Sequence, residues 1–225
     1  MLRLALTGSL VLSSIAVGGA VAAPAKPKVK PVCNLITDEK DDTFALRSQD
    51  AQGAYGPQED ALDIISGDLA SDGKVLIAVV RVKKMALSTG SAPNGLSFRV
   101  QFTHGGLDED TNLFMAGRAS GTNQVFTAGS RAITANLSTK LADVTGVFDV
   151  AKSEVRITAP LYVFKALGGG IKTGTKLQLA ELDQTASRFV TVNPATGSDT
   201  ATFADVTNSA SSYTVGALSC VAPGK

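Results

Sequence analysis

Apolar residues are most concentrated in two runs within residues 60–82, separated by a short polar turn. Leu62 and Ile64 fall on one face of an extended chain, whereas residues 75–82 are apolar at nearly every position. A short run that is rich in Val and Ile and apolar on both faces is typical of a strand in the middle of a sandwich. Residues 71–73, Ser-Asp-Gly, suit a reversing turn. The pattern predicts a β-hairpin.

A second region shows the alternation of a half-buried strand. Phe98, Val100 and Phe102 alternate with polar residues, and residues 112–118 return after a glycine-rich turn. Residues 144–150 and 154–158 predict a further hairpin. Its expected buried side chains are those of Phe148, Val150, Val155 and Ile157. These hairpins predict antiparallel sheets.

The remaining segments complete an all-β prediction with one short helix. Pro160 and Gly168 flank residues 161–167, which is the asymmetry expected of a helix. Residues 132–141 fit either a helical turn or an edge strand. Other strands are expected at residues 32–37, 125–126, 176–182 and 188–192, with loops at residues 38–60 and 193–210 and a closing segment at residues 213–220. We predict one antiparallel, jelly-roll-like β-sandwich over residues 32–221.

The amino terminus carries the features of an export signal. Arg3 precedes an apolar stretch, and Ala20 and Ala22 are the small residues that a signal peptidase requires. We expect a signal peptide at residues 1–22 in preference to a membrane anchor, then a Pro/Lys-rich linker at residues 23–31. Residues 222–225 form a tail. No later segment is apolar for long enough to span a bilayer, so we expect a secreted, extracellular protein.

Charge and composition disfavour two classes of partner. Lys and Arg together number 21 and Asp and Glu 20, so no net field attracts nucleic acid or an anionic membrane. The chain has no Trp and three Tyr, and it therefore offers few rings on which sugars could stack. A cell-wall polysaccharide and a protein both remain candidate partners.

The two cysteines stand at the first and last positions of the predicted domain. Export would take Cys33 and Cys220 into an oxidising compartment, and neither lies in a CxxC pair or a zinc-like spacing. We predict a disulfide between them. Closing so long a loop would stabilise the domain by roughly 5 kcal/mol on the chain-entropy account.

Acidic residues gather before and at the start of the first hairpin. Asp38, Asp42 and Asp63 are the first candidates for the oxygen ligands that Ca²⁺ prefers, although the spacing does not fit an EF-hand. The alternative is a solvated acidic loop. Residues 108–110, Asp-Glu-Asp, are a second candidate. Calcium is the only cofactor that these residues themselves suggest.

Five segments carry a resemblance at the level of fold: residues 36–44, 61–82, 98–104, 146–160 and 174–177. In order and pattern they resemble secreted bacterial β-sandwich domains akin to DOMON domains and family-9 carbohydrate-binding modules. The resemblance implies sugar or metal binding in some relatives and haem in others. For haem, His104 with Met85 or Met115 would be the ligands here.

Motifs for catalysis are weak. His104 is the only histidine, no G-x-S-x-G motif is present, and residues 169–174 have the glycine spacing of a phosphate loop without its Lys-Ser/Thr order. We therefore expect a non-enzymatic binding or structural module at the cell surface, stabilised by calcium. The alternatives are a carbohydrate-binding protein and a glycoside hydrolase that uses paired carboxylates.

Overall fold

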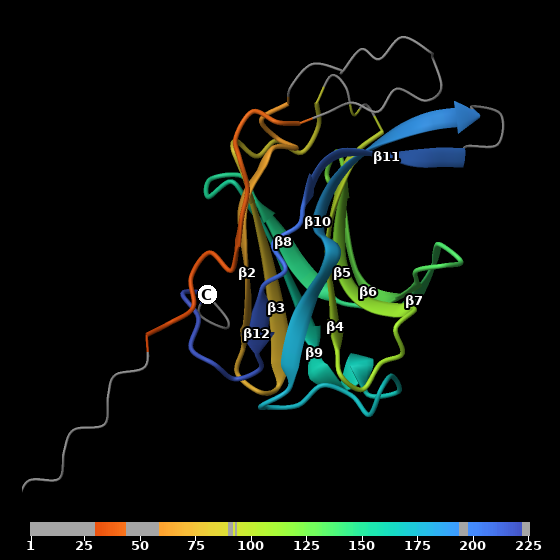
Figure 1. The fold of residues 1–225 in the computed structure, drawn as a ribbon. Coiled ribbons are helices and arrows are strands. Elements are labelled where there is room, and N and C mark those ends of the chain that lie inside the picture. Colours follow the sequence, from red (N-terminus) through yellow and green to blue (C-terminus); the bar gives the residue numbers. More distant parts are fainter. Residues whose placement is uncertain (1–29, 44–58, 90–91, 93, 194–197, 222–225) are drawn as a thin grey trace, which may run out of the picture.

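Two antiparallel β-sheets pack face to face in a computed structural model that describes residues 30–43, 59–89, 92, 94–193 and 198–221 (Figure 1). The five-stranded sheet has the order β1-β2-β3-β9-β8. The other sheet has the order β11-β10-β4-β5-β6-β7, and β12 also pairs with β10. The predicted all-β sandwich is confirmed.

The five-stranded sheet contains β1 (Ile36–Thr37), β2 (Ile64–Ser71), β3 (Val75–Val82), β8 (Thr145–Asp149) and β9 (Glu154–Pro160). The seven-stranded sheet contains β4 (Leu96–His104), β5 (Thr111–Ser120), β6 (Asn123–Ala132), β7 (Leu137–Asp143), β10 (Lys176–Asn193), β11 (Ser198–Thr207) and β12 (Ser212–Thr214).

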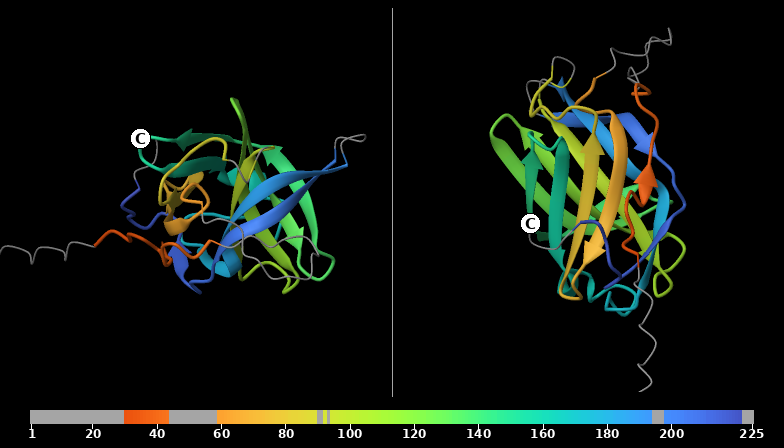
Figure 2. Two further views of the ribbon diagram at one scale, coloured as in Figure 1. Left: turned by 90° about the horizontal axis from the view of Figure 1, so that it is seen from above. Right: turned by 90° about the vertical axis from the view of Figure 1, so that its left-hand side faces the viewer.

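The hairpin of β2 and β3 forms as predicted. Asp72 accepts hydrogen bonds from the backbone N–H groups of Lys74 and Val75 at 2.8 and 3.0 Å, and Gly73 adopts a φ of 84°. Glycine tolerates that left-handed conformation, so the turn closes without strain. The hairpin places β3 between β2 and β9 in the five-stranded sheet (Figure 2, right). The apolar side chains of β3 are buried on both faces. This is the central position that its sequence predicts.

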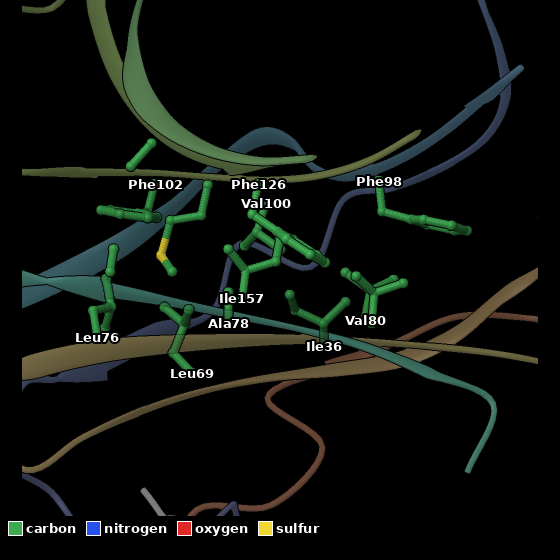
Figure 3. Close-up of a cluster of buried hydrophobic side chains, with 14 of the residues drawn as sticks. Ile36, Leu69, Leu76, Ala78, Val80, Phe98, Val100, Phe102, Phe126 and Ile157 are labelled. Carbon is green, nitrogen blue, oxygen red and sulfur yellow. The ribbon is translucent and has the colours of Figure 1, made fainter. Parts of the chain in front are cut away.

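The main core lies between the inner faces of the sheets (Figure 3). Phe98 and Phe102 of β4 project from the seven-stranded sheet toward Leu76 and Val80 of β3, and all four side chains are fully buried. Phe148 of β8 packs against Phe98 with ring centroids 6.1 Å apart. The alternation along β4 therefore supplies the core from one side and leaves its polar residues on the outer face.

The short helix predicted at residues 161–167 is present as a single 3₁₀ turn, Leu161–Phe164, closed by a hydrogen bond from the Lys165 N–H to the Tyr162 carbonyl three residues earlier. One prediction in this region is wrong. Val150 was expected in the core but is 50% exposed, because β8 ends at Asp149 and Val150 enters the hairpin turn.

The segment predicted as a loop at residues 193–210 instead contains β11, so that prediction is also wrong. β11 pairs with β10, which is one strand across both segments predicted at residues 176–182 and 188–192. Backbone pairing to β10 fixes an edge strand here even though its sequence lacks an apolar period. Residues 132–141, for which two structures were considered, include the start of the edge strand β7.

The ends of the domain meet at the disulfide. Val32 and Ser219 form a parallel bridge, and the predicted Cys33–Cys220 bond joins residues 187 positions apart with their Cα atoms at 5.1 Å. The predicted signal peptide, most of the linker and the tail lie outside the described residues. Within the described part, no helix is long and apolar enough to cross a membrane.

Candidate functional sites

Three carboxylates from both sheets converge at one edge of the sandwich. Asp38 and Asp42 follow β1, Asp205 comes from β11, and one oxygen of each lies within 4.8 Å of the others. We call these three residues the inter-sheet carboxylate cluster. Asp205 also accepts a hydrogen bond from the backbone N–H of Ile64 on β2, at 2.5 Å. Asp205 therefore connects the edge strand of one sheet to the other sheet.

Burial makes negative charge in this cluster unfavourable. Asp205 is 1% exposed, and burial raises its pKa to about 7 against the opposing effect of the Ile64 N–H, with the charges of Asp38 and Asp42 adding to the rise. Burial raises the pKa of Asp38 to about 6, and the charge of Asp42 contributes. One buried oxygen of Asp38, Oδ2, has no hydrogen-bond partner. Among the residues that the structure describes, no basic side chain forms an ion pair with this cluster.

A neighbouring group of acidic residues is neutralised in part by a lysine side chain. Oxygens of Asp41, Asp60 and Asp63 also lie within 4.8 Å of one another, and Lys83 forms ion pairs with Asp41 and, at 2.9 Å, with Asp60. Asp63 is 1% exposed. Its Oδ2 accepts a hydrogen bond from the Asp41 N–H at 2.9 Å, while its buried Oδ1 has no partner.

The structure divides the predicted calcium ligands between the two groups. Asp38 and Asp42 lie together, whereas Asp63 lies in the neighbouring group, where its charge still acts on Asp38. Asp205 was missed because it lies in the segment predicted as a loop, 163 positions beyond Asp42 in the chain. No spacing in the sequence links the two residues.

A second site occupies the outer face of the seven-stranded sheet. In Figure 1 this face lies on the right, between the long ends of β10 and β11 above and the β6–β7 end below. A cavity of about 480 Å³ is lined by Ser97, Arg99, Ala116, Gly117, Arg118, Ser120, Asn123, Val125 and Thr127. A second, of about 170 Å³, is lined by Ser97, Arg99, Gln101, Arg131, Asn136, Thr185, Ser187 and Phe203. Because they share Ser97 and Arg99, they form one depression, which we call the arginine trough.

The haem ligands suggested by resemblance are not strand neighbours. Met115 of β5 pairs with Val100, four residues before His104 on β4, and Met85 lies beyond the end of β3. His104 is buried at the end of β4, where its Nδ1 accepts a hydrogen bond from the Gly106 N–H at 3.2 Å. We do not propose a haem site.

No family model matches the chain, and no curated protein or solved structure matches it.

Proposed function

We propose that the protein is a secreted, non-enzymatic β-sandwich that acts as a binding or structural module at the cell surface, with a calcium ion bound by the inter-sheet carboxylate cluster. The observation that carries the calcium assignment is the mutual separation of its three carboxylate oxygens, at most 4.8 Å. Calcium binds oxygen at about 2.3–2.6 Å, so two ligands of one ion lie no more than about 5 Å apart. Asp38, Asp42 and Asp205 meet that limit.

The charge distribution favours a metal cation over a side chain. Within the described residues, no ion pair includes a member of this cluster. Lys83 instead forms its ion pairs with Asp41 and Asp60. Two charges 4.8 Å apart repel by about 3–4 kcal/mol at an effective dielectric constant of about 20. A divalent cation between the carboxylates adds an attraction to each of them that outweighs this repulsion. An oxygen-only ligand set suits Ca²⁺ better than a softer transition metal.

The ion would serve the fold by joining two sheet edges. Asp38 follows β1 of one sheet, and Asp205 belongs to β11, the edge strand of the other. The disulfide joins the chain ends through Cys33, only five residues before Asp38. A cation at Asp205 would therefore fasten an edge strand that the disulfide does not reach.

Thermal unfolding with and without calcium tests this assignment. At a free calcium concentration 100 times the Kd, binding stabilises the folded state by about 2.7 kcal/mol. For a domain of this size that corresponds to a rise in Tm of about 5–11 °C. The rise should disappear in Asp205→Asn and persist in the matched control Asp143→Asn, which changes an exposed acid at the end of β7, outside both acidic groups. Equal Tm values for the wild type in calcium and in EDTA would refute the calcium site.

The hydrolase alternative has less support. Among the residues whose side chains the structure describes, neither cavity of the arginine trough is lined by a carboxylate. A third cavity, of about 400 Å³, has Glu59 and Asp60 in its lining, but these are consecutive residues and Asp60 is ion-paired with Lys83. Cleavage of a glycoside by two carboxylates requires them on opposite sides of the bound sugar. A binding module fits the described cavities better.

A further inference from the structure

We propose that the arginine trough binds an acidic polysaccharide, with Arg99 and Arg131 contacting the anionic groups of the polymer. This surface is separate from the carboxylate cluster, and its assignment does not depend on calcium. The ligand class follows from the charge, the rigidity, the lining and the length of the trough.

The guanidinium groups of Arg99 and Arg131 are held in place by neutral hydrogen-bond acceptors. Arg99 donates to Ser138 Oγ at 3.2 Å, and Arg131 donates to Gln101 Oε1 at 3.3 Å and Asn136 Oδ1 at 2.8 Å. Among the described residues, no ion pair includes either arginine. Burial and the charge of Arg131 lower the pKa of Arg99. Two neighbouring guanidinium groups without a carboxylate form a site for an anion.

The arginine at the centre of the trough is fixed before any ligand binds. The guanidinium carbon of Arg99 lies 4.4 Å from the centre of the Phe114 ring, a cation–π contact. Phe114 is on the outer face of β5 and is 4% exposed. Gly129 of β6 leaves room for this ring, because a Cβ there would lie only 2.5 Å from its Cζ atom. Such rigidity reduces the entropy lost when a ligand is bound.

The lining suits a sugar polymer better than a nucleic acid. Hydroxyl and amide side chains surround the arginines, including Asn123, Thr127 and Ser187, and they match the donors and acceptors of sugar hydroxyls. Phe203 is 37% exposed at one end and offers an apolar surface to one face of a sugar ring. Binding of single-stranded nucleic acid normally requires several stacking rings.

The length of the trough indicates a polymer. Its lining residues come from β11, β10, β4, β5 and β6, which are consecutive neighbours in the sheet. Neighbouring strands are about 4.8 Å apart, so the trough extends about 19 Å across the sheet. This is longer than one sugar ring, and the arginines lie within it.

Isothermal titration of the full-length, disulfide-intact mature protein tests the proposal in EDTA, because calcium itself associates with polyuronates. The probes are polygalacturonate, its carboxyl-reduced neutral form, heparin and a single-stranded oligonucleotide. We expect binding to polygalacturonate that weakens as salt is raised and that is lost with the carboxyl-reduced polymer. Tighter binding of heparin would assign the site to sulfated polymers, which are still acidic polysaccharides. Equal binding of the neutral polymer, tighter binding of the oligonucleotide, or binding of none of the four would overturn the proposal.

Matched charge-removing variants locate the site. Arg99→Gln and Arg131→Gln should each weaken polysaccharide binding at least tenfold, whereas Lys74→Gln, in the β2–β3 turn of the other sheet, should leave it unchanged. Arg131→Gln does not uncover Phe114 and so separates loss of binding from loss of folding. If Arg131→Gln binds like the wild type while its Tm is normal, the trough is not the site. Because these titrations contain no calcium, a failure of the cation site would not affect their outcome.

Discussion

Replacing Asp205 by Asn should stabilise the protein in EDTA at pH 8. The folded-state pKa of Asp205 rises from 3.8 to about 7 through burial, so at pH 8 the structure holds a charge that it disfavours. A rise of that size corresponds to about 4 kcal/mol as an upper value. Asn keeps an oxygen that accepts the hydrogen bond from Ile64 but loses the acceptor that bonds the Val206 N–H. We therefore expect a net gain of about 1–3 kcal/mol.

The sign of the pH dependence follows from the same pKa. Between about pH 4 and pH 7 the folded state binds a proton at Asp205 that the unfolded state has released. The stability contributed by this group is thus complete below pH 4 and is lost as the pH rises to about 7. The variant has no such group, so its advantage over the wild type should grow by about 2–3 kcal/mol from pH 5 to pH 8.

Urea unfolding of both proteins at pH 5, 6, 7 and 8 measures this difference, with Asp143→Asn as the control for loss of an exposed acid. In millimolar calcium the order at pH 8 should reverse, because the ion binds the carboxylate of the wild type and finds a weaker ligand in the amide. Stability curves that stay parallel from pH 5 to pH 8 in EDTA would show that Asp205 does not titrate in this range. They would refute the reasoning from burial.

Three further predictions concern the fold. Replacing Cys33 and Cys220 together by Ser should lower the free energy of unfolding by up to about 5 kcal/mol, because the disulfide closes a loop of 187 residues. Urea denaturation measures this loss, and an unchanged midpoint would contradict a stabilising disulfide. Gly67→Ala should destabilise the protein, because the new Cβ would lie 1.9 Å from Gln184 Nε2. Adding Gln184→Ala should relieve that clash, so the double variant should lose less stability than the sum of the two single variants. A loss equal to that sum would contradict the clash. Leu76→Ala should lower the free energy of unfolding by about 2–5 kcal/mol, because Leu76 is fully buried between the sheets. A loss below about 1 kcal/mol would show that Leu76 does not belong to the core.

The features that were predictable from sequence are those encoded by side-chain periodicity. The β2–β3 hairpin and β4 follow from apolar runs, alternation and the turn chemistry of Asp72 and Gly73. β11 was missed because a strand paired at an edge is held by its backbone, and its residues Ser198–Thr207 are mostly small and polar. The same residues had the composition of a loop.

The candidate sites were predictable only where their residues are close in sequence. Asp38 and Asp42 could be proposed together because one loop holds both, but their partner Asp205 depends on how β11 is placed against β2. Arg99 and Arg131 come from strands that are separated by β5, and the register of that sheet brings them together. Such registers depend on contacts distant in sequence.

A bulge in β11 explains how one short strand serves both sites. Residues two apart in a regular strand point to the same face, yet Phe203 lines the arginine trough while Asp205 bonds across to β2. The register of β11 against β10 shifts between these positions: Asp205 pairs with Ala186 and Phe203 with Ser187, which leaves Ala204 as the extra residue. A bulge of this kind redirects a side chain to the other face. The bulge therefore lets β11 present Phe203 to the arginine trough and Asp205 to the inter-sheet carboxylate cluster.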